Sequence, residues 1–296
     1  MPIIKILDPG GPKQESVQGS YLAAAVMAAA LSRVSEPINA TAKSPQRTRA
    51  EKTRRGNPNR LSVNQHVFPL KSTERFTQGG RVSVSLKART KVMSLKPNDA
   101  LFCAHRAWDQ RAEAGYMKRI EDEFQTVVAP IIDGKVETIA TKQKPAVDRM
   151  FALWYLRARY RELEQQEVQL KGVTGNALTK EQEENLEQNC YLFVRRGGTM
   201  PARLLNGVQL QQRIGAYARE LAADVTRWGV ISAQSGEFIV PDVPSQWIIP
   251  LSPHLALVGS APDGVIVEQN LAEINRAARD ASQVYFFARD FSACYV

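Results

Sequence analysis

The chain has 296 residues, of which 44% are hydrophobic and 23% are charged, and its formal net charge is +9. This composition excludes disorder of the whole chain and provides enough apolar material for one large domain or two small ones. The three cysteines are far apart and form no Cys-x-x-Cys pair, which supports neither a disulfide framework nor a structural zinc site and favours the reducing cytoplasm.

The positive charge is concentrated in the first hundred residues. Residues 1–60 contain ten Lys and Arg against four acids, and residues 61–100 contain seven against two, whereas the remainder contains 22 against 24. This distribution predicts nucleic acid as a partner, bound through residues 43–96 by phosphate contacts without sequence preference. The predicted nucleic-acid-binding cations of the leading segment are Lys43, Arg47, Arg49, Lys52, Arg54, Arg55 and Arg60.

The first sixty residues are predicted to lie outside the folded body. The Ala-rich segment 21–31 is too short to span a bilayer, which needs about 20 apolar residues, and it lacks the compact basic start of a signal peptide. We therefore expect a short helix there and no membrane partner. Residues 33–60 have almost no apolar periodicity and predict a flexible basic arm, so the chain divides into 1–60 and a single domain at 61–296.

The first part of the body predicts a hairpin followed by helices. Residues 81–86 alternate with period two, and residues 91–95 provide a partner strand. Asp99 is a suitable cap for a helix that begins near Ala100 and continues to Trp108. Further helices are expected in this part at 110–131 and 145–169, and the second of them has the stronger apolar face.

The second part predicts two helices, a group of strands and a final helix. The helices cover 178–194, ended by Gly197-Gly198, and 205–228. Strands are expected at 229–232, 237–240, 247–250 and 254–258, and the final helix is expected at 269–287. The fold class predicted is α+β, a mostly helical single domain in which residues 61–96 and 229–260 form one small antiparallel sheet.

The segment Asn64-Gln65-His66 places three polar side chains in an apolar run, where each of them needs a hydrogen-bonding partner. His66 is a candidate general acid or base, and Asn64 and Gln65 are candidate ligands of a substrate or phosphate. The alternative is a structural histidine. The spacing of the three histidines fits no metal site, so no metal is predicted and no cofactor is assigned.

Three further residues are candidates for the same site. Glu113 falls near the apolar stripe of its predicted helix and is a candidate catalytic carboxylate, with a helix-capping role as the alternative. Arg157 is a candidate phosphate ligand, with stacking on Trp154 as the more common outcome. Asp242 lies between two prolines at a strand end, which is typical of a rigidly held catalytic carboxylate and also of an ordinary turn.

Read together, these motifs resemble the bacterial family catalogued as domain of unknown function 4238. The resemblance covers about residues 61–290 and rests on the order of short motifs, which are Asn64-Gln65-His66 with Pro69, Cys103-Ala-His-Arg-Ala-Trp108, Glu113 to Glu121, Trp154-Tyr-Leu-Arg157, Phe238 to Pro244, Pro250-Leu-Ser-Pro253 and Asn275 to Tyr285. Val67 replaces the family's aromatic residue, and Pro241 stands where the family more often has serine. The resemblance implies a mixed helical domain, marks His66, Glu113, Arg157 and Asp242, and implies no reaction.

Two functions follow as hypotheses. The first is a nucleic-acid-associated effector of a defence or toxin type, in which the basic residues bind phosphates and the polar set binds or cleaves a phosphorylated substrate. The second is a non-catalytic protein-interaction module in which the polar residues are structural. Whether the chain is an enzyme is left open at this point.

Overall fold

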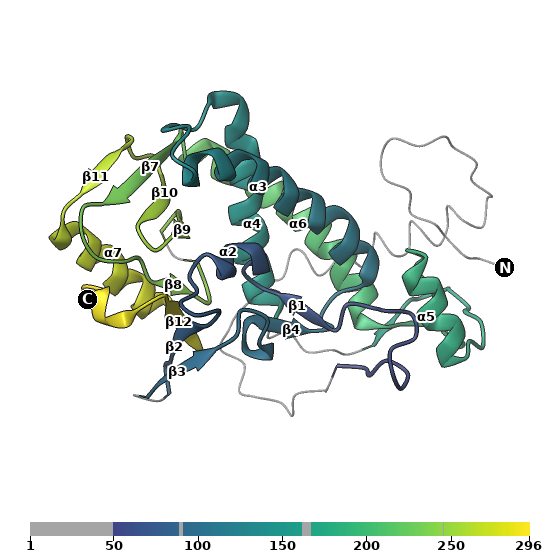
Figure 1. The fold of residues 1–296 in the computed structure, drawn as a ribbon. Coiled ribbons are helices and arrows are strands. Elements are labelled where there is room, and N and C mark those ends of the chain that lie inside the picture. The colour runs from purple at the N-terminus through teal and green to yellow at the C-terminus, as the bar shows by residue number, and fades with distance from the viewer. Residues whose placement is uncertain (1–49, 89–90, 162–166, 245) are drawn as a thin grey trace. The chain divides into compact units, whose positions relative to one another are not determined.

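The computed structural model describes residues 50–88, 91–161, 167–244 and 246–296, which form an α+β fold with small, mainly antiparallel sheets, as predicted (Figure 1). The chain divides into two compact units whose segments alternate along the sequence. The described segments of unit 1 are 50–65, 105–118 and 167–213, and those of unit 2 are 66–88, 91–104, 119–161, 214–244 and 246–296. The body therefore differs from the single domain expected at 61–296.

Residues 50–60 belong to unit 1 and not to a separate arm. The backbone N–H and Nε of Arg54 donate to Glu184 at 2.6 and 3.2 Å, and Glu51 accepts bonds from several cations of the same unit. These ion pairs anchor the segment to the unit, which corrects the boundary predicted at residue 60. The Ala-rich segment 21–31, together with Lys43, Arg47 and Arg49, lies outside the described residues.

Unit 1 is built around α5 (Lys180–Gln188) and the first half of α6 (Ala202–Asp224). Thr179 caps α5 in a capping box, because its hydroxyl accepts from Gln182 N while the Gln182 side chain accepts from Thr179 N. The apolar core beside these helices includes Phe193, Met200, Leu204 and Leu205. The remaining elements are the π-helix η2 (Ala112–Met117) and the paired strands β5 (Val168–Gln169) and β6 (Thr199–Met200).

The helix predicted at 178–194 ends six residues early, at Gln188 with Asn189 as its C-cap. The glycine pair Gly197-Gly198 does not end a helix. Both glycines have positive φ, at +88° and +84°, in the turn that pairs Arg195 with Thr199. A Cβ on Gly198 would lie 2.4 Å from the Val173 carbonyl oxygen, so this position requires glycine.

The helix predicted from Ala100 to Trp108 is wrong. Asp99 does cap a helical turn, because its carboxylate accepts from Leu101 N at 2.9 Å, but the turn is the single 3₁₀ turn η1 (Ala100–Phe102). The chain then becomes extended in β4 (Cys103–His105), which pairs with β1 (Asn64–His66) in a two-stranded sheet. Strand pairing offers these backbone groups partners that a local helix would otherwise supply.

The helices of unit 2 include α3 (Lys118–Ile132) and α4 (Lys144–Tyr160), both in predicted regions, together with the short α2 (Leu70–Glu74). Trp154 of α4 is fully buried and contacts Phe68, with 4.6 Å between the ring centroids. An ion pair between Arg149 and Glu123 links α4 to α3 at 2.5 Å. These contacts form the helical side of the unit 2 core.

The first sheet of unit 2 has the strand order β3-β2-β12-β8 and is fully antiparallel (Figure 1). The strands are β2 (Val82–Leu86), β3 (Val92–Leu95), β8 (Val240–Pro241) and β12 (Tyr285–Ala288). The predicted hairpin is therefore confirmed. The predicted final helix is correct only to Ala281, where α7 (Glu268–Ala281) ends, because Tyr285 and Phe287 form strand β12 and pack their rings against Phe102.

The second sheet of unit 2 has the order β11-β7-β10-β9. Its strands are β7 (Trp228–Ala233), β9 (Ile248–Ser252), β10 (Leu255–Gly259) and β11 (Gly264–Ile266), and β11 runs parallel to β7. Residues 61–96 and 229–260 thus share a sheet only through β8, with β12 between them. Helix α7 packs Leu271 into the core of the second sheet and Ala278 into a core beside the first.

No helix in the described ranges combines the length and apolar character that crossing a bilayer requires.

Candidate functional site

The buried side chain of Gln65 finds its hydrogen-bonding partners inside unit 1. Its side chain is fully buried, its Oε1 accepts from Ala107 N at 2.8 Å and Trp108 N at 3.2 Å, and its Nε2 donates to Trp108 O at 2.8 Å. The amide thus accepts two hydrogen bonds and donates one, all with the backbone of one strand-to-helix connection. Gln65 holds this connection in place, and its fully buried side chain offers no exposed donor for the predicted role as a substrate ligand.

The neighbours of Gln65 differ from it in exposure. Asn64 is exposed, and His66 is partly buried with its Nε2 at 3.3 Å from Pro97 O. A carbonyl oxygen only accepts, so Nε2 carries the proton in this contact. Burial lowers the pKa of His66, and the positive charge of Arg157 lowers it further against the opposing effect of the Pro97 bond. His66 is therefore neutral at pH 7.

Arg157 is buried and pairs with Glu121 of α3. A guanidinium taken out of water needs such a carboxylate, because an unpaired buried charge costs several kcal/mol. The Glu121 carboxylate also acts on His66, whose pKa it raises slightly. His66, Arg157 and Glu121 therefore form one electrostatically coupled group of unit 2, and it includes two of the predicted site residues.

Glu113 belongs to unit 1 and accepts a hydrogen bond from Trp108 Nε1 at 2.6 Å. Trp108 has no exposed surface, so its indole N–H needs this acceptor. Glu113 is in the first turn of the π-helix η2, where a carboxylate also interacts favourably with the helix dipole. Glu113 therefore binds the indole of Trp108, which neither the catalytic nor the helix-capping expectation described.

Asp242 is held in unit 2 by backbone groups. Its two carboxylate oxygens accept from Gln283 N, Val284 N and Tyr285 N at 2.9, 2.8 and 3.4 Å, in the turn between α7 and β12. Burial raises the pKa of Asp242, and the three N–H groups counteract that rise. No hydrogen bond joins His66 to Asp242 within the described chain, so these two candidates for one site are not linked directly.

Buried Asn275 binds backbone groups as Gln65 and Asp242 do, although the sequence did not indicate it as a site residue. It accepts from Ile239 N and donates to Glu237 O and Tyr295 O, at 2.9, 2.8 and 3.0 Å. Glu237 in turn binds Arg289 at 2.5 Å, and Arg289 donates to His254 Nε2 at 3.0 Å. An asparagine inside an amphipathic helix was the only available signal, and it does not reveal these distant partners.

The predicted basic residues in the described part of the arm have different environments. Lys52, Arg55 and Arg60 are exposed, whereas Arg54 is committed to Glu184 and Glu181. Arg54 therefore holds the segment to α5 and does not present a free cation to nucleic acid. The side chains of Lys52, Arg55 and Arg60 remain exposed at the surface.

Among its described residues, the β2–β3 hairpin of unit 2 carries four exposed cations, Arg81, Lys87, Lys91 and Lys96. Arg81 donates to Ser94 Oγ and Ser94 O, and Lys87 Nζ donates to Arg279 O. None of the four pairs with a carboxylate in the part of the chain that the structure describes, so their charge is not neutralised locally.

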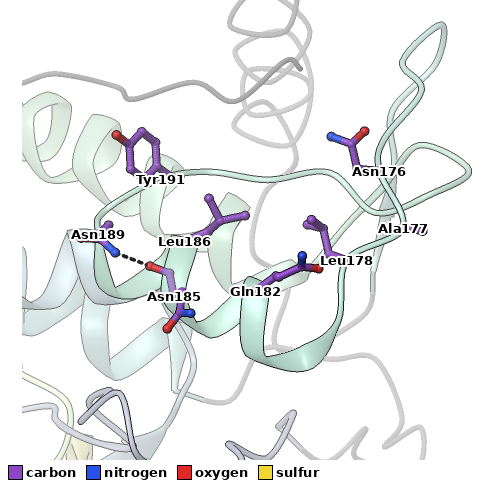
Figure 2. Close-up of a pocket in the computed structure, with 8 residues that line it drawn as sticks. All are labelled: Asn176, Ala177, Leu178, Gln182, Asn185, Leu186, Asn189 and Tyr191. Carbon is purple, nitrogen blue, oxygen red and sulfur yellow. Dashed lines mark hydrogen bonds between the residues drawn. The ribbon is translucent and has the colours of Figure 1, made fainter.

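A cavity with a volume of about 460 Å³ lies along α5 in unit 1 (Figure 2). Its lining consists of amide and apolar side chains without a charged residue, namely Asn176, Ala177, Leu178, Gln182, Asn185, Leu186, Asn189 and Tyr191. The volume lies within the usual range for small-molecule pockets. The lining chemistry suits a neutral ligand and does not match the phosphorylated substrate predicted from the sequence.

A second cavity of about 240 Å³ in unit 1 is lined by three arginines, Arg106, Arg195 and Arg203, and by Glu51, Glu167, Pro201 and Ala202. Carboxylates of α5 form ion pairs with these guanidinium groups. Glu187 accepts from both Arg106 and Arg203, at 2.6 and 2.9 Å, and Glu183 binds Arg195 at 2.6 Å.

Three acidic residues of α5 lie on an internal face of the helix. In the structure Glu183, Glu184 and Glu187 are buried, with 5%, 0% and 2% of their surface exposed. The i, i+4 spacing of Glu183 and Glu187 places both on one helix face, but a charged helix face is usually solvated. Only the distant arginines show that this face is internal.

No family model matches the chain, and no curated protein and no solved structure matches it. The resemblance to the domain of unknown function 4238 family accordingly stays a hypothesis based on short motifs.

Proposed function

We propose that this chain binds the phosphate backbone of nucleic acid through the β2–β3 hairpin, without reading base sequence. The observation that carries the proposal is the set of four exposed hairpin cations that lack carboxylate partners in the described chain. Such cations gain free energy by releasing the counterions of a polyanion. A cytoplasmic location is part of the proposal and agrees with the three free cysteines.

The strand register supports a shared binding face. Val82 pairs with Leu95, so continuation of the ladder puts Arg81 opposite Lys96. Side chains alternate along a strand, and both cations therefore face away from the side on which Val82 and Val84 are buried. Ser94, which is exposed on the same strand face as Lys96, adds a hydroxyl donor. β3 is the edge strand of its sheet, which leaves this face accessible from one side.

The length of the hairpin suits several phosphates. Arg81 and Lys87 are six residues apart, which at a rise of roughly 3.3 Å per residue gives about 20 Å. A nucleic-acid strand has one phosphate per roughly 3.4 Å of helix axis, so the hairpin spans about six nucleotides. Lys91 and Lys96 bound the opposite strand. Five residues separate them, so Lys96 shares the face of Arg81 and Lys87, whereas Lys91 belongs to the other face.

The proposal assigns binding and no cleavage step. Gln65 and Asp242 direct their polar atoms at backbone groups, and Glu113 accepts the Trp108 indole N–H. These contacts favour the reading in which the polar residues stabilise the fold. A nuclease would need a catalytic group that faces the substrate, whereas these three side chains bind other parts of the protein.

The test is a filter-binding titration of duplex DNA at several salt concentrations. The three phosphate contacts of the shared face, made by Arg81, Lys87 and Lys96, predict a slope of log affinity against log salt of about −2.7, at about −0.9 per contact. The double substitution Lys91→Ala and Lys96→Ala should bring the slope to about −1.8 and weaken all DNA sequences equally.

The matched control removes two exposed lysines elsewhere in unit 2, Lys135→Ala and Lys142→Ala. It causes the same change in net charge. The proposal is wrong if the control and the hairpin variant weaken binding to the same degree, or if wild-type affinity does not depend on salt.

A further inference from the structure

The small cavity of unit 1 contains more buried positive charge than α5 alone neutralises. Arg106 and Arg203 share the single carboxylate of Glu187, and they are 2% and 3% exposed. Burial lowers the pKa of Arg106, and the neighbouring charge of Arg203 lowers it further. Two guanidinium groups on one carboxylate leave an excess positive charge, which requires a second anion.

The second anion is Glu51, which comes from the segment before the body. Its Oε1 lies 2.5 Å from Lys180 Nζ and 2.8 Å from Arg195 Nη2, and its Oε2 lies 2.5 Å from Arg203 Nη1. Burial by itself would raise the pKa of Glu51, but Arg203, Lys180 and Arg195 outweigh it and lower the pKa to about 2. The carboxylate is therefore ionised at any pH near neutrality.

Two of the arginines that line the cavity retain buried donors that Glu51 does not use. Arg106 Nε and Arg203 Nη2 are buried N–H donors without a hydrogen-bond partner in the described chain. A carboxylate presents two oxygens, whereas a phosphate group presents three or four. The unused donors of two cavity-lining arginines are therefore what a larger oxyanion would engage.

The first turn of α6 adds to the same site. Pro201, Ala202 and Arg203 line the cavity, and α6 begins at Ala202 and continues for 23 residues. The free N–H groups and the dipole at the start of a long helix attract anions. The volume of about 240 Å³ lies below the usual range for drug-sized ligands and suits a single small group.

We propose that this cavity is a binding site for a phosphate group, either inorganic phosphate or a phosphomonoester, and that Glu51 is an internal competitor that occupies it in the unliganded chain. Phosphate binding displaces the Glu51 side chain and with it one of the two side-chain anchors of residues 50–54, the other being the pair of Arg54 and Glu184. Arg203 is the central ligand, because it binds Glu51, contacts Glu187 and has an unused N–H. The site is independent of the hairpin proposed above, since it lies in unit 1 and uses other residues.

The experiment measures binding of inorganic phosphate to the full chain by isothermal titration calorimetry, against chloride at equal ionic strength. Glu51→Ala should bind phosphate at least tenfold more tightly than the wild type, because the competing carboxylate is gone. Glu51→Gln, which keeps the side-chain size and an acceptor, should show a smaller gain. Arg203→Met in the Glu51→Ala background should abolish binding.

The matched control is Glu181→Ala, which removes an acid of the same unit that pairs with Arg54 and does not line the cavity. It should leave phosphate affinity at the wild-type value. A gain equal to that of Glu51→Ala would overturn the proposal, because it would indicate a general charge effect. Folded Glu51→Ala and Glu51→Gln variants that bind no phosphate would overturn it as well.

Folding defects do not obscure the result. If Glu51→Ala is destabilised, phosphate should restore its melting temperature while chloride does not, and failure of that rescue in both Glu51 variants rejects the site. A 5′-phosphorylated dinucleotide that binds through Arg203 while its 5′-hydroxyl counterpart does not would identify a nucleic-acid end as a source of the phosphate. Lys91→Ala with Lys96→Ala should leave phosphate binding unchanged.

Discussion

Replacement of Gln65 by alanine should be among the most destabilising single changes in unit 1. The substitution removes one acceptor shared by Ala107 N and Trp108 N and one donor to Trp108 O. It removes all three of these hydrogen bonds from the interior of the unit, because Gln65 itself has no exposed surface. Each unsatisfied buried group costs about 1–3 kcal/mol. Allowing for partial relaxation and entry of water, we expect a loss of about 3–5 kcal/mol in the free energy of unfolding.

The adjacent residue provides the control. Asn64 is exposed, and Asn64→Ala should change the free energy of unfolding by less than about 0.5 kcal/mol. Urea unfolding followed by tryptophan fluorescence and far-ultraviolet circular dichroism measures both variants. Since two units can unfold in separate steps, the slopes of the transitions are compared as well as their midpoints. A cost below about 1 kcal/mol for Gln65→Ala would refute the role of Gln65 in holding this connection in place.

The remaining predictions concern other buried groups. Asp242→Ala should cost about 2–4 kcal/mol because it frees the N–H groups of the α7–β12 turn, and Asp242→Asn should cost less, because burial raises the pKa of Asp242 and thus disfavours its charge. Folding lowers the pKa of His66, so the stability associated with its neutral ring is present above the unfolded pKa of about 6.5. This stability is lost as the pH falls through the folded pKa. His66→Gln should therefore reduce the fall of the melting temperature with decreasing pH. In α6, Gly207→Ala should destabilise, because its Cβ would lie 1.8 Å from Asp109 Oδ1, whereas Gly215→Ala, whose Cβ would have only an ordinary contact, should stabilise by about 0.5–1 kcal/mol. Equal effects of the two glycine substitutions on the melting temperature would contradict the close approach to Asp109.

The buried ionic groups explain why the candidate site could be predicted only in part. Polar residues in an apolar run correctly indicated that Gln65 needs partners, and Asp242 between prolines correctly indicated a rigidly held carboxylate. Neither pattern indicates whether the partner is a substrate or the backbone. Glu51 was counted as part of a flexible arm, because its ligands Lys180, Arg195 and Arg203 are more than a hundred residues away in sequence.

Local sequence signals determined the α+β class, the main bodies of α3, α4 and α6, the β2–β3 hairpin and the excess of cations before residue 100. These features depend on periodicity, capping and composition, which act over a few residues. Tertiary structure alone decided that 285–288 is a strand, that residues 50–60 join unit 1, and that the acidic face of α5 is internal. Each of these outcomes depends on pairing between segments distant in sequence, whose free energy outweighs the local preference.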